Sequence, residues 1–176
     1  MKCLITATFL VHAFLIILYV PITQCRVQTM DEKLIEDVCK QTPNFDLCVS
    51  SLHSDPKSSS ADVPELALIM ANIINVKATS TLNHIKDLLK EGSGDRDALV
   101  SCGQNYIAIL EIDLPQAIKA LINGAYDIAE DGFADAVLEA NFCEEGFSSG
   151  SSPLTDTNKY ICDASGVARA IARLLI

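Results

Sequence analysis

Apolar positions recur at helical spacing along most of the chain after residue 30. At its beginning the pattern forms two short segments, Met30 to Gln41 and about Asn44 to Ser54, separated by Pro43, which cannot continue a helix. A polar run from Asp55 to Ser60 then predicts a turn. These segments predict a small helical hairpin at the N-terminal end of the fold.

A first long apolar stripe begins at Asp62, which forms a capping-box pattern with Glu65, and continues to about Lys90. The run Gly92 to Gly94 ends it. Its predicted inward face consists of Leu66, Ile69, Met70, Ile73, Val76, Ser80, Thr81, Ile85, Leu88 and Leu89.

A second long stripe extends from about Asp95 to Ile122 and contains Pro115. Proline lacks a backbone N–H and its ring clashes with the preceding turn, so we expect a kink or a break there. Asp113 and Gln116 could cap a new helix start. The pair Asn123-Gly124 is typical of a helix C-terminus.

Two more stripes, Tyr126 to Phe147 and about Thr155 to Leu175, are separated by a polar loop from Ser148 to Pro153. The positions expected to be buried are Ile128, Ala129, Phe133, Ala136, Val137, Ala140 and Cys143 in the first, and Tyr160, Ile161, Ala164, Val167, Ala168, Ile171 and Leu174 in the second. The pattern predicts an all-α fold: an up-down-up-down four-helix bundle preceded by the hairpin.

The first 25 residues have a different character. Lys2 precedes a nearly continuous apolar run from Leu4 to Val20, and no further charge occurs before Arg26. This pattern predicts a signal peptide, residues 1–25, that is removed on export; a retained membrane anchor is the alternative. The remaining residues, 26–176, are the length of one domain.

Charge and composition narrow the classes of partner. Residues 26–176 contain 12 basic and 23 acidic residues, a formal charge of −11. Such acidity argues against nucleic acid and against anionic membrane surfaces as partners. The absence of tryptophan and the low aromatic content favour helices over strands.

After removal of the signal peptide five cysteines remain: Cys39, Cys48, Cys102, Cys143 and Cys162. In an oxidising compartment four would pair and one would be left over, and several pairings are possible. The close spacing of Cys39 and Cys48 suits a clipped hairpin. No Cys-x-x-Cys pair occurs, and His53 and His84 lack ligand-like spacing, so we expect neither a metal site nor a cofactor.

Sequence motifs for catalysis are absent. The chain has no Gly-x-Ser-x-Gly, no phosphate-binding glycine loop and no histidine-centred motif, so we expect no catalytic residues and no enzyme activity. The acidic pairs Glu130-Asp131 and Glu144-Glu145 are interpreted as solvated helix surface. Cys162 is interpreted as a buried small residue rather than a reactive thiol.

The mature chain resembles the plant family of invertase and pectin methylesterase inhibitors over essentially its whole length. The segments that carry the resemblance are 39–48 (CKQTPNFDLC), 66–70 (LALIM), Cys102, 129–132 (AEDG), 143–147 (CEEGF) and 166–175 (GVARAIARLL). The resemblance implies the disulfides Cys39–Cys48 and Cys102–Cys143. It also implies a four-helix bundle with an N-terminal hairpin, which docks on a carbohydrate enzyme of the cell wall or vacuole.

The segment from Gly124 to Gly132 is most similar to the invertase-inhibitor branch, whose members commonly read Gly-Asp-Pro-Lys-Phe-Ala-Glu-Asp-Gly there. The residues that the resemblance places at the target are Tyr126, Asp127, Ile128, Glu130 and Asp131. The flanks match, but Tyr-Asp-Ile replaces Pro-Lys-Phe. Invertase hydrolyses sucrose with carboxylates, so Asp127 would meet like charge, and we expect weak inhibition or other contacts.

Two alternatives remain. The related branch covers pectin methylesterase with the faces of its middle helices, where Asn75, Lys77, Asn83 and Asn105 could serve. The other is a secreted storage-like or defence protein, such as a pollen allergen, that keeps the fold without inhibition. In each case we expect secretion to the cell wall (apoplast) or delivery to the vacuole, with no membrane contact after signal cleavage.

Overall fold

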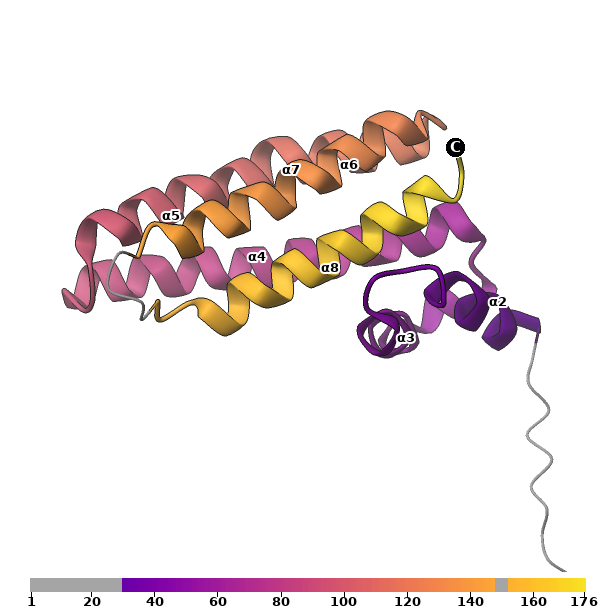
Figure 1. Ribbon diagram of the computed structural model, residues 1–176, viewed down its shortest axis with the longest axis horizontal. Coiled ribbons are helices and arrows are strands. Elements are labelled where there is room, and N and C mark those ends of the chain that lie inside the picture. The colour runs from indigo at the N-terminus through magenta and orange to yellow at the C-terminus, as the bar shows by residue number, and fades with distance from the viewer. Residues whose placement is uncertain (1–29, 148–151) are drawn as a thin grey trace, which may run out of the picture.

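The computed structural model describes residues 30–147 and 152–176 of the 176-residue chain. Within these ranges every regular element is helical, as the apolar pattern predicts (Figure 1). The expected signal peptide and most of the expected loop from Ser148 to Pro153 lie outside the described residues. No helix in the described part is long and apolar enough to cross a membrane.

The predicted hairpin is formed by α2 (Met30–Cys39) and α3 (Phe45–Ser54). Asn44 caps α3 because its side chain accepts a hydrogen bond from the Leu47 N–H at 3.2 Å. The disulfide Cys39–Cys48, with the two Cα atoms 5.5 Å apart, ties α2 to α3. The run expected as a turn is a short 3₁₀ helix, η1 (Pro56–Ser60), because the Asp55 side chain caps it.

Four long antiparallel rods follow, and they are drawn in Figure 1 as α4, the α5–α6 rod, α7 and α8. Their bounds are α4 (Val63–Glu91), α5 (Arg96–Ala108), η2 (Ile109–Asp113), α6 (Leu114–Ile122), α7 (Tyr126–Glu145) and α8 (Thr155–Arg173). The predicted up-down-up-down bundle is confirmed. A second disulfide, Cys102–Cys143, joins α5 to α7; both pairs are those that the family resemblance implied.

α4 begins with the predicted capping box: Asp62 and Glu65 exchange side-chain and backbone hydrogen bonds. It ends at Gly92, whose φ of 70° is favourable for glycine. The inward face differs from the prediction, because Val76 is 70% exposed and Ser80 is also exposed. Its buried positions are Leu66, Ala67, Ile69, Met70, Ala71, Ile74, Ala78, Thr81 and Ile85.

Of the kink or break expected at Pro115, a break does not occur, but the helix is distorted there. α5 continues into α6 through one π-helical turn, η2, in which the Leu114 N–H bonds to the Ile109 carbonyl five residues earlier. This wider turn accommodates Pro115, which has no N–H to place in the helix. Asp113 has helical dihedral angles and makes no capping bond, so its expected role as a cap is wrong.

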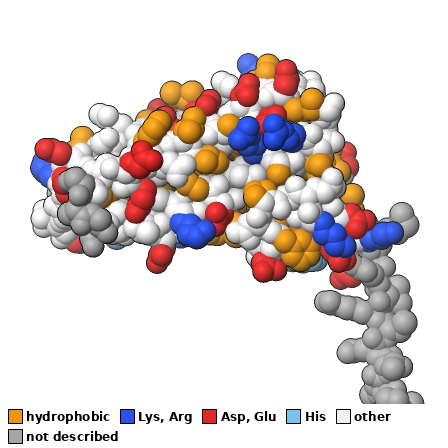
Figure 2. All heavy atoms as spheres, viewed as in Figure 1, with side chains coloured by type: hydrophobic (Ala, Val, Ile, Leu, Met, Phe, Trp, Pro, Cys, Tyr) orange, Lys and Arg blue, Asp and Glu red, His pale blue; other side chains and the backbone are white. Residues whose placement is uncertain are grey.

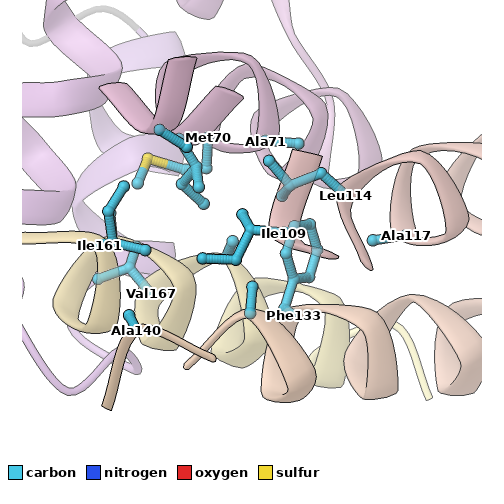
Figure 3. Close-up of a cluster of buried hydrophobic side chains, with 14 of the residues drawn as sticks. Met70, Ala71, Ile109, Leu114, Ala117, Phe133, Ala140, Ile161 and Val167 are labelled. Carbon is cyan, nitrogen blue, oxygen red and sulfur yellow. The ribbon is translucent and has the colours of Figure 1, made fainter. Parts of the chain in front are cut away.

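The core lies between the four rods. Figure 3 shows Ile109, the first residue of the π-turn, and Leu114, the first residue of α6, beside Phe133 of α7. All three are at most 1% exposed. On α7 and α8, two further residues expected in the core are outside it: Ile128 is 45% exposed, and Leu174, which follows the last residue of α8, is 38% exposed.

Candidate functional site

The turn between α6 and α7 is the segment for which the sequence predicted target contacts. α6 ends in a Schellman motif: Gly124 donates its N–H to the Leu121 carbonyl at 3.2 Å, and Ala125 donates to the Ala120 carbonyl at 2.9 Å. Gly124 has a φ of 71°, which a residue with a side chain rarely adopts. The connection is therefore short and held by backbone hydrogen bonds.

The residues after this turn form the first helical turn of α7 rather than an extended loop. Tyr126 is half-buried and packs against the core, whereas Asp127 is exposed. Ile128 is 45% exposed. An acidic side chain and an apolar side chain are thus presented to solvent at the N-terminus of a helix.

A shallow cavity of about 590 Å³ lies beside this turn. Its lining residues come from α6, the Schellman turn and α7: Pro115, Gln116, Lys119, Ala120, Asn123, Ala125 and Ile128. Ile128 and Pro115 give it an apolar wall, and Lys119 contributes a cationic side chain. We call these seven residues the α6–α7 groove.

Glu130, one of the expected target residues, instead pairs within the molecule. Its Oε1 accepts hydrogen bonds from Arg169 Nε at 3.2 Å and Arg169 Nη2 at 3.1 Å, and Arg173 Nε lies 3.3 Å away. Only 14% of the Glu130 side chain is exposed. This cluster ties α7 to α8, whereas the neighbouring Asp131 is exposed.

The other candidate residues are dispersed. Figure 2 shows acidic side chains scattered over the visible face, without a large cluster of one charge. On α4, Asn75, Lys77 and Asn83 are exposed. Asn105 of α5 is turned toward α7, because its side-chain amide donates to the Glu139 carbonyl at 3.2 Å. Asn105 is thus engaged within the bundle, whereas the three α4 residues are exposed to solvent.

Two sequence-based interpretations can be refined. Glu144, expected to be solvated helix surface, accepts hydrogen bonds from Asn158 at 2.7 Å and from Thr155 at 2.5 Å. Cys162 is a free, half-buried thiol with its Sγ 3.2 Å from Asn141 Oδ1, and burial raises its pKa. No group of histidine, cysteine and acidic residues within the described chain could hold a metal ion.

The sequence pattern does not reveal the groove, because Pro115 predicts only a kink or a break in the helix. Pro115, Gln116 and Lys119 are spaced along one exposed side of α6, and that spacing is readable in the sequence. Their position beside Ile128, however, depends on the tight turn that returns α7 along α6.

Comparison with known proteins gives three findings. A family model described as plant invertase/pectin methylesterase inhibitor matches residues 33–171. The chain is 48% identical over 138 residues to the "Cell wall / vacuolar inhibitor of fructosidase 1" of Arabidopsis thaliana, a match that covers 78% of this chain and 67% of that protein. It is 28% identical over 145 residues to the "Pectinesterase inhibitor" of Actinidia deliciosa, covering 81% and 78%.

Among solved structures, a mutant form of a pectin methylesterase inhibitor from Arabidopsis superimposes with a TM-score of 0.70. That match covers 81% of this chain and 97% of the other at 22% sequence identity. The likeness establishes that the helical fold is shared.

Proposed function

This chain belongs to the plant invertase/pectin methylesterase inhibitor family, and we propose that it inhibits an acid invertase, a β-fructofuranosidase, by forming a 1:1 complex with it. The family consists of inhibitor proteins, so the chain is not itself an enzyme. Its partner is a protein, and the proposal needs no cofactor.

The observation that carries the choice of target is the difference in identity between two relatives. The protein named as an inhibitor of fructosidase shares 48% of aligned residues with this chain, against 28% for the pectinesterase inhibitor. A second inhibitor of fructosidase from Arabidopsis thaliana shares 36% over 117 residues. The sequence is therefore nearer to the fructosidase inhibitors than to the pectinesterase inhibitor.

We place the docking surface at the α6–α7 groove and the adjoining first turn of α7. The groove includes the apolar side chains of Pro115 and Ile128, and exposed Asp127 directly precedes Ile128 in the chain. Protein interfaces gain most of their affinity from a few well-buried anchors in such pockets. Glu130 acts indirectly in this proposal, by holding α7 on α8 through Arg169 and Arg173.

Charge complementarity sets the expected strength of this docking. An invertase active site contains carboxylates, so Asp127 opposes binding wherever it approaches them. Lys119 of α6 is the one cationic residue among the seven that line the groove. We propose that Lys119 offsets part of the repulsion, with Ile128 supplying the apolar contact.

For location, we propose that residues 1–25 direct export and that the mature protein reaches the cell wall (apoplast) or the vacuole. The relative at 48% identity is named a cell wall / vacuolar inhibitor. Two disulfides also suit an oxidising export route, since cytosolic thiols are kept reduced.

The experiment is a parallel titration of an acid invertase and a plant pectin methylesterase with protein purified from secreting plant cells, at about pH 5, a mildly acidic medium suited to an acidic chain. We expect loss of sucrose hydrolysis at a 1:1 ratio, with size-exclusion chromatography showing the complex. Loss of methylesterase activity alone would assign the chain to the other target. No effect on either enzyme would favour a non-inhibitory defence or allergen role.

A further inference from the structure

The last residue of the π-turn, Asp113, is a buried acid. It is only 7% exposed, and its Oδ2 has no hydrogen-bond partner in the described part of the chain. An ionised carboxylate without partners in the interior is unfavourable, whereas a protonated one is tolerated. The Asp113 carboxyl therefore strongly favours its protonated form over its ionised form.

The charges around Asp113 strengthen this preference. η2 packs against α4, α5, α6 and α7, but the charged groups that act on the Asp113 carboxyl are Asp135 and Glu139, both on α7. No described cation of these helices or of η2 itself compensates it. Burial first, and then these two carboxylates, raise the pKa of Asp113 to about 6. Burial and Asp135 also raise the pKa of Glu139.

Asp113 lies where the π-turn packs against α7. A Cβ placed at Gly132 of α7 would lie 2.8 Å from the Asp113 carbonyl oxygen and 3.0 Å from the Ala117 Cβ. The backbones therefore approach closely at this crossing. Asp113 also directly precedes α6, whose first residue, Leu114, is in the core beside Phe133 (Figure 3).

We propose that Asp113 is a proton-operated latch: when it is protonated, η2 and α6 pack closely on α7, and when it is ionised, its repulsion by Asp135 and Glu139 loosens that contact. The device belongs to the fold and exists without any target enzyme. It is a response to pH and requires no ligand.

The direction of the pH effect follows from linkage. The ordinary pKa of the carboxyl is 3.8, and in the folded chain it is about 6, so between these values the folded state binds more protons than the unfolded state. The stabilisation is complete below the lower value and is lost as the pH rises through the higher one. The latch is therefore closed in acid and open near neutrality.

The latch would also regulate docking, a consequence that rests on the proposed function. α6 carries Pro115 and Lys119 of the α6–α7 groove. If α6 loosens from α7, the two walls of the groove lose their fixed spacing. We expect the groove to be best formed in the acidic wall or vacuole.

The test is denaturant unfolding of the secreted protein and its Asp113→Asn variant from about pH 4 to about pH 8, without any target. Asparagine resembles the protonated acid at every pH. The unfolding equilibrium constant of the natural chain, divided by that of the variant, should rise roughly 100-fold across this range, the value expected for a pKa displaced by about 2 units. A ratio that does not change with pH would overturn the latch.

Two further variants distinguish the effect of the charges beside Asp113 from a general effect of acidic residues on the pH dependence of stability. Asp135→Asn removes a charge that repels Asp113 and should reduce the pH dependence, even if Asp113→Asn proves unable to fold. Asp131→Asn, an exposed acid on the same helix, should leave it unchanged. Equal effects of the two would overturn the proposal. Since invertase is absent, a failure here is distinct from a failure of inhibition, which would be seen only with enzyme present.

Discussion

The Tyr106 hydroxyl of α5 donates a 2.8 Å hydrogen bond to Asn158 Oδ1 of α8, across the interior of the bundle. Both residues are at most 1% exposed. Asn158 in turn donates to Glu144 of α7 at 2.7 Å. One buried polar side chain thus connects three of the four rods, next to the Cys102–Cys143 disulfide.

We predict that Asn158→Leu destabilises the protein more than Tyr106→Phe. The first substitution removes the partner that the Tyr106 hydroxyl and Glu144 Oε2 share, and it places an apolar side chain between them, whereas the second leaves only one lone pair of Asn158 unused. Losses of about 2 to 3 and about 1 kcal/mol, respectively, are expected from the cost of unsatisfied buried polar groups. Urea denaturation measures both, and an equal loss for the two variants would contradict the central role of Asn158.

A second prediction concerns the crossing of α6 and α7. Gly132→Ala should cost about 1 to 3 kcal/mol, because its Cβ would overlap the backbone at Asp113. Gly103→Ala is the matched control: its Cβ would meet only Ile85 Cγ2, at an ordinary 3.7 Å. The control should be neutral or stabilise by up to about 1 kcal/mol through helix propensity. Thermal unfolding of the two variants side by side decides the matter; similar melting temperatures would show that the crossing can relax.

A third prediction tests the charge of the docking surface. Asp127→Lys should strengthen inhibition of acid invertase by roughly tenfold, the equivalent of about 1.4 kcal/mol, because it replaces a like charge by an opposite one. The measurement is the inhibition constant for sucrose hydrolysis.

Asp156→Lys provides the control for this charge change. Asp156 is the second residue of α8, as Asp127 is of α7, and α8 begins at the opposite end of the bundle (Figure 1). Asp156→Lys changes the net charge by the same amount as Asp127→Lys, but it should leave the inhibition constant nearly unchanged. If both variants bind more tightly to the same extent, the effect comes from overall charge, and the proposed surface is wrong.

A fourth prediction concerns the thiols. Of the seven cysteines in the chain, four form disulfides and Cys3 and Cys25 belong to the expected signal peptide. Secreted protein should therefore contain one reactive thiol per chain, Cys162, when unfolded in denaturant without reductant. In the folded state it should react slowly, because burial raises its pKa and restricts access. A count of three thiols would indicate that residues 1–25 remain attached.

The helix ends that the sequence predicts correctly are those set by residues close to one another in the chain. Asp62 with Glu65 fixes the start of α4, and Gly92 and Gly124 end helices at positions where only glycine adopts a positive φ readily. Each of these depends on contacts within one turn of the chain.

The errors arise where tertiary packing decides. Val76 is apolar but faces solvent, because the neighbours of α4 cover Ile74 and Ala78 instead. Pro115 predicts a kink or a break, yet a π-turn directly before it keeps the helical hydrogen bonding continuous from α5 into α6. The groove combines residues of α6 and α7, so the helical pattern of neither element alone reveals it.

The three-residue connection between α6 and α7 determines how the proposed docking surface can vary. Because backbone hydrogen bonds at Gly124 and Ala125 fix the path of the chain, the exposed side chains at 127 and 128 can be exchanged without altering the backbone that presents them. A surface fixed before encounter also loses little conformational entropy on association. Preference for one enzyme over another can then change by substitution of a few side chains on a constant scaffold.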